Sequence, residues 1–199
     1  MREIIKLVIV LSIICAVSAA TLTATKLKLE SKIEKQQDLY IRGPALERLF
    51  NRPAGELLDN KVMFNVEKQT FPVFYLKENG EITGLALEAS GSGGYGGDIN
   101  IIIGIDLKTE LMVGMEIIEH KETPGVGSRV EGTKFRKQWI NISLKDDVAL
   151  KSQGGNIDAI SGATYSSKAV VNGTNIIINL LKKHRDEIIA LIKAENKQA

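Results

Sequence analysis

Residues 99–118, INIIIGIDLKTELMVGMEII, decide the fold class of this chain. Every second residue of 99–105 is isoleucine, and an apolar residue occupies every second position of 111–117. β-Branched and other apolar residues at a spacing of two are typical of half-buried strands. The stretch therefore predicts two antiparallel strands, joined by a short turn at residues 108–109.

The residues on either side extend this prediction. Val62–Val66 and Phe71–Leu76 are strand-like, and Asn79-Gly80 is a strong hairpin signal before a further strand at Ile82–Glu88. The last third instead has apolar positions at helical spacing. These positions are Ala169, Gly173, Ile176, Ile177, Leu180, Leu181, His184, Ile188, Leu191 and Ile192. The body is therefore predicted to be α+β, an antiparallel sheet with a long C-terminal helix packed on it.

The N-terminal segment predicts a membrane anchor. No residue of 7–25 is charged, and this stretch would span roughly 28 Å as a helix, close to the roughly 30 Å of a bilayer core. An uncleaved transmembrane helix is favoured over a cleaved signal peptide, because the apolar run is long and a charged helical stretch follows directly. A lipoprotein site at Cys15 is weakly supported, since bulky residues precede the cysteine.

Membrane orientation stays open at this point. Four lysines in residues 26–35 outnumber the two basic residues before the span, which would place the body in the cytoplasm. Long domains are translocated largely regardless of that count. Residues 26–60 are expected to form a charged helical neck with a loop, and residues 61–199 the body.

Composition excludes several classes of function. The 199 residues carry a formal charge of +2, too balanced for nucleic-acid binding as a main activity. One cysteine excludes an internal disulfide and an iron–sulfur cluster, and two histidines supply a haem poorly. Any redox chemistry would therefore require an organic cofactor or a metal with O/N ligands. No metal site and no catalytic residue is predicted.

Three loops contain more glycine and hydroxyl residues than connections need: Ser90–Gly97, His120–Gly127 and Asp158–Ser167. Each also has a plain explanation, namely a flexible connection, a turn and a helix N-cap. One cap needs one hydroxyl, however, and the third loop places four before or within the first turn of a helix. Because a helix N-terminus binds phosphate, this loop is predicted to anchor a phosphate-bearing ligand.

The same loops carry a family resemblance. Ser161-Gly162-Ala163-Thr164-Tyr165-Ser166, preceded by Asp158, resembles the flavinylation motif of the FMN-binding domain family. Residues 94–97 and 120–127 resemble two further elements of that family, and Phe135 and Gln138 match its Phe-x-x-Gln pattern. The resemblance covers roughly residues 85–185, with Val126 standing where leucine is commoner.

The resemblance implies a covalent cofactor. Thr164 would carry FMN through a phosphoester bond, made by a flavin transferase that uses FAD as donor. Three groups of residues would then contribute to cofactor binding. Phosphate contacts are expected from Ser161, Gly162, Ala163 and the amides that open the helix, and Ser166 and Ser167 are expected among the cofactor-binding residues. Asp158 would position the loop or assist the modification. Gly96 and Gly97 are expected close to the cofactor, and contacts to the ring edge are expected from Tyr95, Glu122 and Thr123.

Within that family, the chain is most similar to the G subunits of Rnf electron-transport complexes. The resemblance implies an electron-transfer subunit, not an autonomous enzyme, with other membrane and soluble subunits as partners. It places residues 1–6 in the cytoplasm and the body outside the cytoplasmic (inner) membrane. Three alternatives stay open: the C subunit of a Na+-translocating NADH:quinone reductase, a non-redox module binding a phosphorylated ligand, and a structural subunit.

Overall fold

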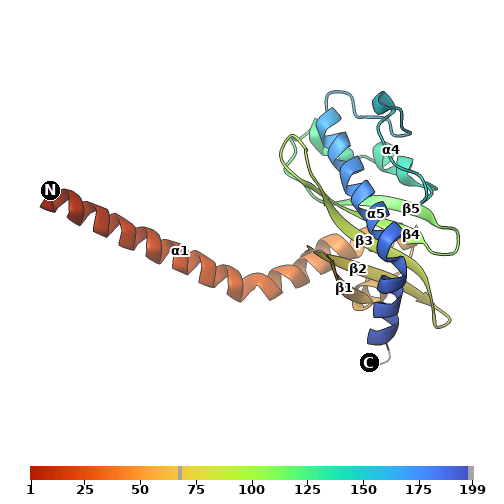
Figure 1. Ribbon diagram of the computed structural model, residues 1–199, viewed down its shortest axis with the longest axis horizontal. Coiled ribbons are helices and arrows are strands. Elements are labelled where there is room, and N and C mark those ends of the chain that lie inside the picture. Colours follow the sequence, from red (N-terminus) through yellow and green to blue (C-terminus); the bar gives the residue numbers. More distant parts are fainter. Residues whose placement is uncertain (67–68, 197–199) are drawn as a thin grey trace. The chain divides into compact units, whose positions relative to one another are not determined.

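The computed structural model describes residues 1–66 and 69–196, and the chain divides into two compact units after Tyr40 (Figure 1). The first unit consists of the helix α1, Arg2–Gln37, and the start of a π-helical turn, Asp38–Arg42. No residue of α1 is buried. Its apolar part has a mean hydropathy of 2.5 over 18 residues, so α1 is long and apolar enough to cross a membrane.

The second unit is built on a five-stranded antiparallel sheet with the strands in sequence order. The strands are β1 (Lys61–Val66), β2 (Gln69–Glu78), β3 (Glu81–Gly91), β4 (Ile99–Asp106) and β5 (Leu111–Glu119). Each of the predicted strands and the predicted turn is present. In the β2–β3 hairpin, Asn79 and Gly80 both have positive φ, 52° and 84°, as a tight two-residue hairpin turn requires.

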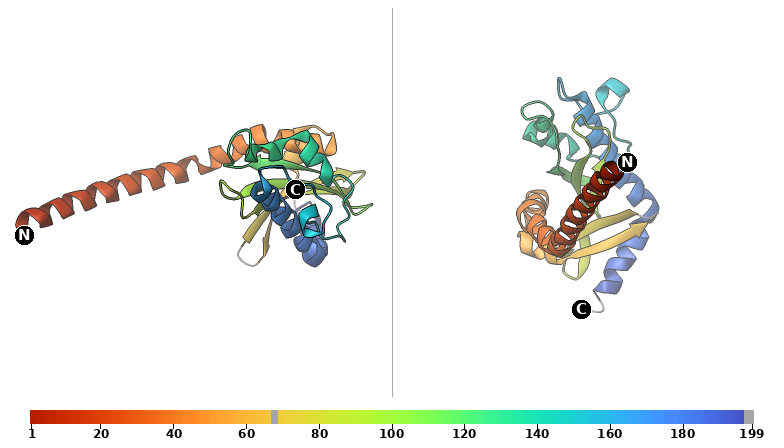
Figure 2. Two further views of the ribbon diagram at one scale, coloured as in Figure 1. Left: turned by 90° about the horizontal axis from the view of Figure 1, so that it is seen from above. Right: turned by 90° about the vertical axis from the view of Figure 1, so that its left-hand side faces the viewer.

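Helices cover both faces of this sheet (Figure 2, left). α5, Thr164–Glu195, packs on the face formed by the alternating isoleucines of β4, whose side chains are fully buried. α2 (Gly43–Phe50) and α3 (Ala54–Asp59) pack on the other face, where Leu46 and Leu57 bury Ile102. The prediction that β4 is half-buried was therefore wrong, because residues expected in a charged neck cover its second face.

α5 follows the predicted helical spacing except at two points. Ile176, expected in the core, is 37% exposed. His184 has non-helical dihedrals (φ −125°, ψ 15°) that kink the helix, and its ring packs 5.7 Å from that of Phe64. Further along the core, Trp139 is fully buried and donates its indole N–H to Thr174 Oγ1 at 2.8 Å.

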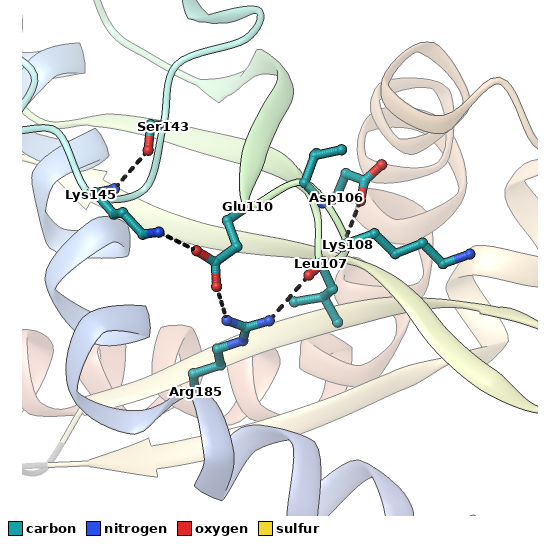
Figure 3. Close-up of polar contacts among 8 residues, drawn as sticks. Asp106, Leu107, Lys108, Glu110, Ser143, Lys145 and Arg185 are labelled. Carbon is teal, nitrogen blue, oxygen red and sulfur yellow. Dashed lines mark hydrogen bonds and ion pairs between the residues drawn. The ribbon is translucent and has the colours of Figure 1, made fainter.

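An ion-pair cluster fixes α5 to the β4–β5 turn just after the kink. Figure 3 shows Glu110 between Arg185 and Lys145, with Arg185 also donating to the carbonyl oxygen of Leu107 at 3.1 Å. Lys145 Nζ lies 3.2 Å from Glu110 Oε2. The Arg185 hydrogen bond, followed by that of Lys145, lowers the pKa of the Glu110 carboxyl from its ordinary 4.5.

Replacing Glu110 with glutamine is expected to lower the free energy of unfolding at neutral pH. Because the folded pKa is depressed, the ionised carboxylate contributes stability above about pH 4.5, and this is lost as the pH falls through the folded pKa. The effect is small, since the Glu110 side chain is 33% exposed and solvent screens the pair. Urea unfolding of parent and variant across the acid range tests this. A stability difference that does not shrink toward low pH would contradict it.

Candidate functional site

A cavity of about 260 Å³ lies where the three glycine- and hydroxyl-rich loops meet. Each loop contributes to the wall, so residues up to 71 positions apart in sequence share one site. The lining residues are Tyr95, Glu122, Thr123, Val126, Gly127, Gly162, Ala163, Thr164, Tyr165 and Ser166.

Glu122 joins the three loops. Its side chain is buried, the residue being 5% exposed. The Gly96 N–H donates to Oε1 at 3.0 Å, and the Ser166 hydroxyl donates to Oε2 at 2.8 Å. The Glu122 N–H in turn donates to His120 Nδ1 at 3.1 Å. Each carboxylate oxygen therefore holds a different loop, which fixes the shape of the cavity.

Two glycines make this close approach possible. A Cβ on Gly96 would lie 2.0 Å from the carbonyl oxygen of Lys121, and one on Gly127 would lie 2.2 Å from Glu122 Oε2. Neither contact is tolerable for a side chain, so both loops need glycine at these positions. The glycine richness that the sequence shows is thus partly a packing requirement.

Thr164 is the first residue of α5, exposed at the edge of this cavity. The N-cap residue, Ala163, provides no side-chain hydrogen bond, so the first N–H groups of the helix are not capped by a hydroxyl. Among residues 1–66 and 69–196, none forms a hydrogen bond with Thr164 Oγ1. Within the part of the chain that the structure describes, the cavity edge thus presents a hydroxyl without a hydrogen-bond partner, at a helix start whose N-cap residue has no capping side chain.

The neighbouring serines have structural roles instead. Ser167 is buried, accepts from the Ile160 N–H at 2.9 Å and donates to the Ala163 carbonyl at 3.0 Å. Ser166 is bonded to Glu122, as described above. Ser166 and Ser167 are therefore accounted for by contacts within the protein, whereas the Thr164 hydroxyl has no such partner among the described residues.

Several predicted site residues lie outside the cavity lining. These are Gly96, Gly97, Asp158, Ser161 and Ser167. Asp158 forms an ion pair with Lys151 at 2.7 Å, and its backbone is held by Gln138, which accepts from its N–H at 2.7 Å and donates to its carbonyl at 3.2 Å. Gln138 of the Phe-x-x-Gln pattern thus holds the loop backbone at Asp158, outside the lining of the cavity that Thr164 borders.

A second cavity of about 540 Å³ lies along the same loop. Its lining includes Arg129, Phe135, Gln138, Asp158 and Ser161, and Arg129 Nη1 donates to the Ser161 carbonyl at 3.3 Å. Ser161 and Asp158 therefore belong to this neighbouring hollow, separate from the one that Thr164 lines.

Three lining residues were absent from the predicted set: Val126, Gly127 and Tyr165. All three stand inside the quoted motifs, which was the available signal. Tyr165 is 68% exposed, Tyr95 79% and Val126 45%, so large apolar side chains surround the mouth of the cavity. Such exposed groups are unusual around a purely structural loop and are typical of a ligand or partner site.

Comparison with known proteins agrees with this geometry. The family described as FMN-binding domain matches residues 94–179, which contain every residue of the cavity lining. The part of the chain that carries the cavity is thus similar to FMN-binding domains.

Similarity to individual relatives is more specific. The G subunit of the ion-translocating oxidoreductase complex of Haemophilus influenzae is 32% identical over 174 residues, covering 82% of each chain. The G subunit from Pasteurella multocida is 29% identical over 174 residues, covering 83% of this chain and 86% of its own. The chain belongs to the family of G subunits of ion-translocating oxidoreductase complexes.

The fold also resembles a solved structure. The crystal structure of the C subunit of the Na+-translocating NADH-quinone reductase from Parabacteroides distasonis has a TM-score of 0.50. It is 20% identical, and the match covers 82% of this chain and 94% of that one. The similarity concerns the architecture alone.

Proposed function

We propose that this chain is an electron-transfer subunit of a membrane-bound, ion-translocating ferredoxin:NAD+ oxidoreductase. It would relay electrons through FMN attached by a phosphoester bond to Thr164 Oγ1. One observation carries the proposal: an exposed threonine hydroxyl, free of hydrogen bonds in the described chain, stands at the uncapped N-terminus of α5 on the edge of the cavity.

The surrounding residues suit a phosphate. The first amides of a helix and the positive end of its dipole stabilise negative charge. Gly162 has a φ of +80°, which lets the backbone of Ser161–Ala163 turn tightly before Thr164. In the attachment step, a flavin transferase would join the FMN phosphorus of FAD to Thr164 Oγ1, break the pyrophosphate bond, and release AMP and the hydroxyl proton.

The cavity suits a ring that stays partly exposed. Its volume of about 260 Å³ is below the roughly 300–1,000 Å³ of sites that enclose a whole ligand. Tyr95 and Tyr165 project at its mouth and offer flat apolar surfaces to an aromatic ring. When bound, a flavin supplies one- and two-electron transfer, and an exposed edge would be reachable by redox partners.

The apolar helix α1 and the covalent attachment of the flavin are consistent with the same cellular location. We propose that α1 spans the cytoplasmic membrane, with residues 1–6 inside the cell and residues 61–199 outside as the flavin domain. A reversibly bound flavin would be lost to a dilute extracytoplasmic medium, whereas a covalent one stays at high effective concentration. The other membrane and soluble subunits of the complex would be its partners.

Peptide mass spectrometry on protein from the native host's membranes tests the attachment. The peptide that contains Thr164 is expected to carry an additional mass of roughly 0.4 kDa, one FMN residue. The yellow colour is expected to stay with the chain in denaturant. Consistently bare peptides would contradict the proposal and favour a non-redox module or a structural subunit. Recombinant protein must be made together with a flavin transferase.

A further inference from the structure

We infer that Glu122 holds the reduction potential of the flavin low, by placing an unneutralised negative charge in the wall of its cavity. The inference rests on the proposed function, since it concerns the same site. It assigns Glu122 a positioning and electrostatic role beyond contact with the ring edge.

A comparison of buried glutamates carries this inference. In the part of the chain that the structure describes, three glutamates are buried: Glu88 (8% exposed), Glu116 (7%) and Glu122 (5%). The first two are paired with arginines on the sheet face that α2 covers. Glu88 pairs with Arg42 at 3.0 Å, and Glu116 pairs with Arg48 at 2.8 Å and with Arg136.

Glu122 is different, because its partners are neutral. Its oxygens accept from the Gly96 N–H and the Ser166 hydroxyl, and no ion pair of Glu122 is present within residues 1–66 and 69–196. The Gly96 N–H can only donate, and the Ser166 hydroxyl can donate as well, so both contacts suit an ionised carboxylate. Burying a charge without a counter-charge is costly, so an uncompensated one in a cavity wall points to a role in the site.

Two glycines lie close to this carboxylate. A Cβ on Gly127 would lie 2.2 Å from Oε2, and one on Gly94 would lie 2.5 Å from Oε1 and 2.3 Å from the Gly97 carbonyl oxygen. Glycine at both positions therefore leaves room for the Glu122 side chain.

The expected effect on the flavin follows from electrostatics. Reduction adds electrons to the ring, and a nearby negative charge opposes their addition. Water and salt screen a buried charge less than an exposed one. The Glu122 carboxylate should therefore shift the reduction potential of the flavin to more negative values than the same cavity without the charge would give.

Replacing Glu122 with glutamine separates charge from structure. The glutamine carbonyl can still accept from the Gly96 N–H, and its amide can still bond the Ser166 hydroxyl, which can accept as well as donate. The full chain, loaded with flavin, is titrated with dithionite against a reference dye. Glu122→Gln is expected to shift the potential to a more positive value, and the matched variant Glu119→Gln, at an exposed carboxylate near the end of β5, much less.

Failure of the inference can be told from failure of the proposed function. A loaded Glu122→Gln protein whose potential equals that of the parent would overturn the inference and leave the flavin assignment intact. A parent protein without flavin on Thr164 would overturn both. Glu122→Asp keeps the charge and so separates charge from packing. If Glu122→Gln shifts the potential and Glu122→Asp does not, the inference is supported; if both shift it equally, the shift comes from altered packing and the inference is overturned.

Discussion

Replacing Thr164 with valine is expected to remove the covalent flavin completely. Valine has nearly the shape of threonine but lacks the oxygen that the phosphoester requires. The Thr164 hydroxyl forms no hydrogen bond within the described residues, and the side chain is exposed, so stability should change by no more than about 0.5 kcal/mol. The variant should therefore fold normally yet lose roughly 0.4 kDa of mass, its yellow colour and electron transfer.

Intact mass, absorption spectrum and thermal unfolding together measure this result. Thr133→Val is the matched control, since Thr133 is also an exposed first residue of a helix, α4 (Thr133–Arg136), but does not line the cavity. The control should keep the full added mass. A Thr164→Val protein that still carries the adduct would place the attachment elsewhere, and one that fails to fold would show that the hydroxyl is structural.

Gly91→Ala is expected to displace α5 from the sheet. The new Cβ would lie 1.9 Å from the carbonyl oxygen of Ala169 and 2.8 Å from the amide nitrogen of Gly173, and both are backbone atoms. Neither contact can be relieved by a rotamer change, so helix and strand must separate. Overpacking of this kind typically costs about 1–3 kcal/mol and occasionally more.

The functional consequence is equally testable, because the displaced helix begins at Thr164. Flavin loading should fall together with the free energy of unfolding, measured by denaturant titration. Gly55→Ala is the control: it lies in α3, and its Cβ would meet no atom within 4 Å. That change should be neutral or stabilising by up to about 1 kcal/mol. Equal stability of the two variants would contradict the close contact between β3 and α5.

Local sequence pattern accounts for most of the fold. The alternation in residues 99–117, the Asn79-Gly80 turn and the helical spacing after Ala169 each reflect interactions between near neighbours, and each element is present. The pattern could not show that β4 is covered on both faces. That depends on α2 and α3, which lie well before β4 in the chain, within a stretch whose charges predict a neck.

The candidate site, like the fold, could be predicted from the sequence only in part. The three motif loops could be found from composition, and the structure brings all three to one cavity. The position of Asp158 in the motif did not show that it lies outside the cavity lining. Its contacts with Lys151 and Gln138, which hold it there, are tertiary. Val126 and Tyr165 stand in the quoted motifs, but only their exposure shows that they border the cavity.

Spacing, turn chemistry and motif content, which are local properties, were enough to establish an α+β body, an apolar N-terminal helix and a threonine at a helix start. The burial of the Glu122 carboxylate and its hydrogen-bond partners were decided by tertiary contacts. Its oxygens are held by groups 26 and 44 residues away, and its burial without an arginine contrasts with Glu88 and Glu116. The reason is physical: the solvation and pairing of a charge depend on what the fold brings near it, which the neighbouring residues in the chain do not specify.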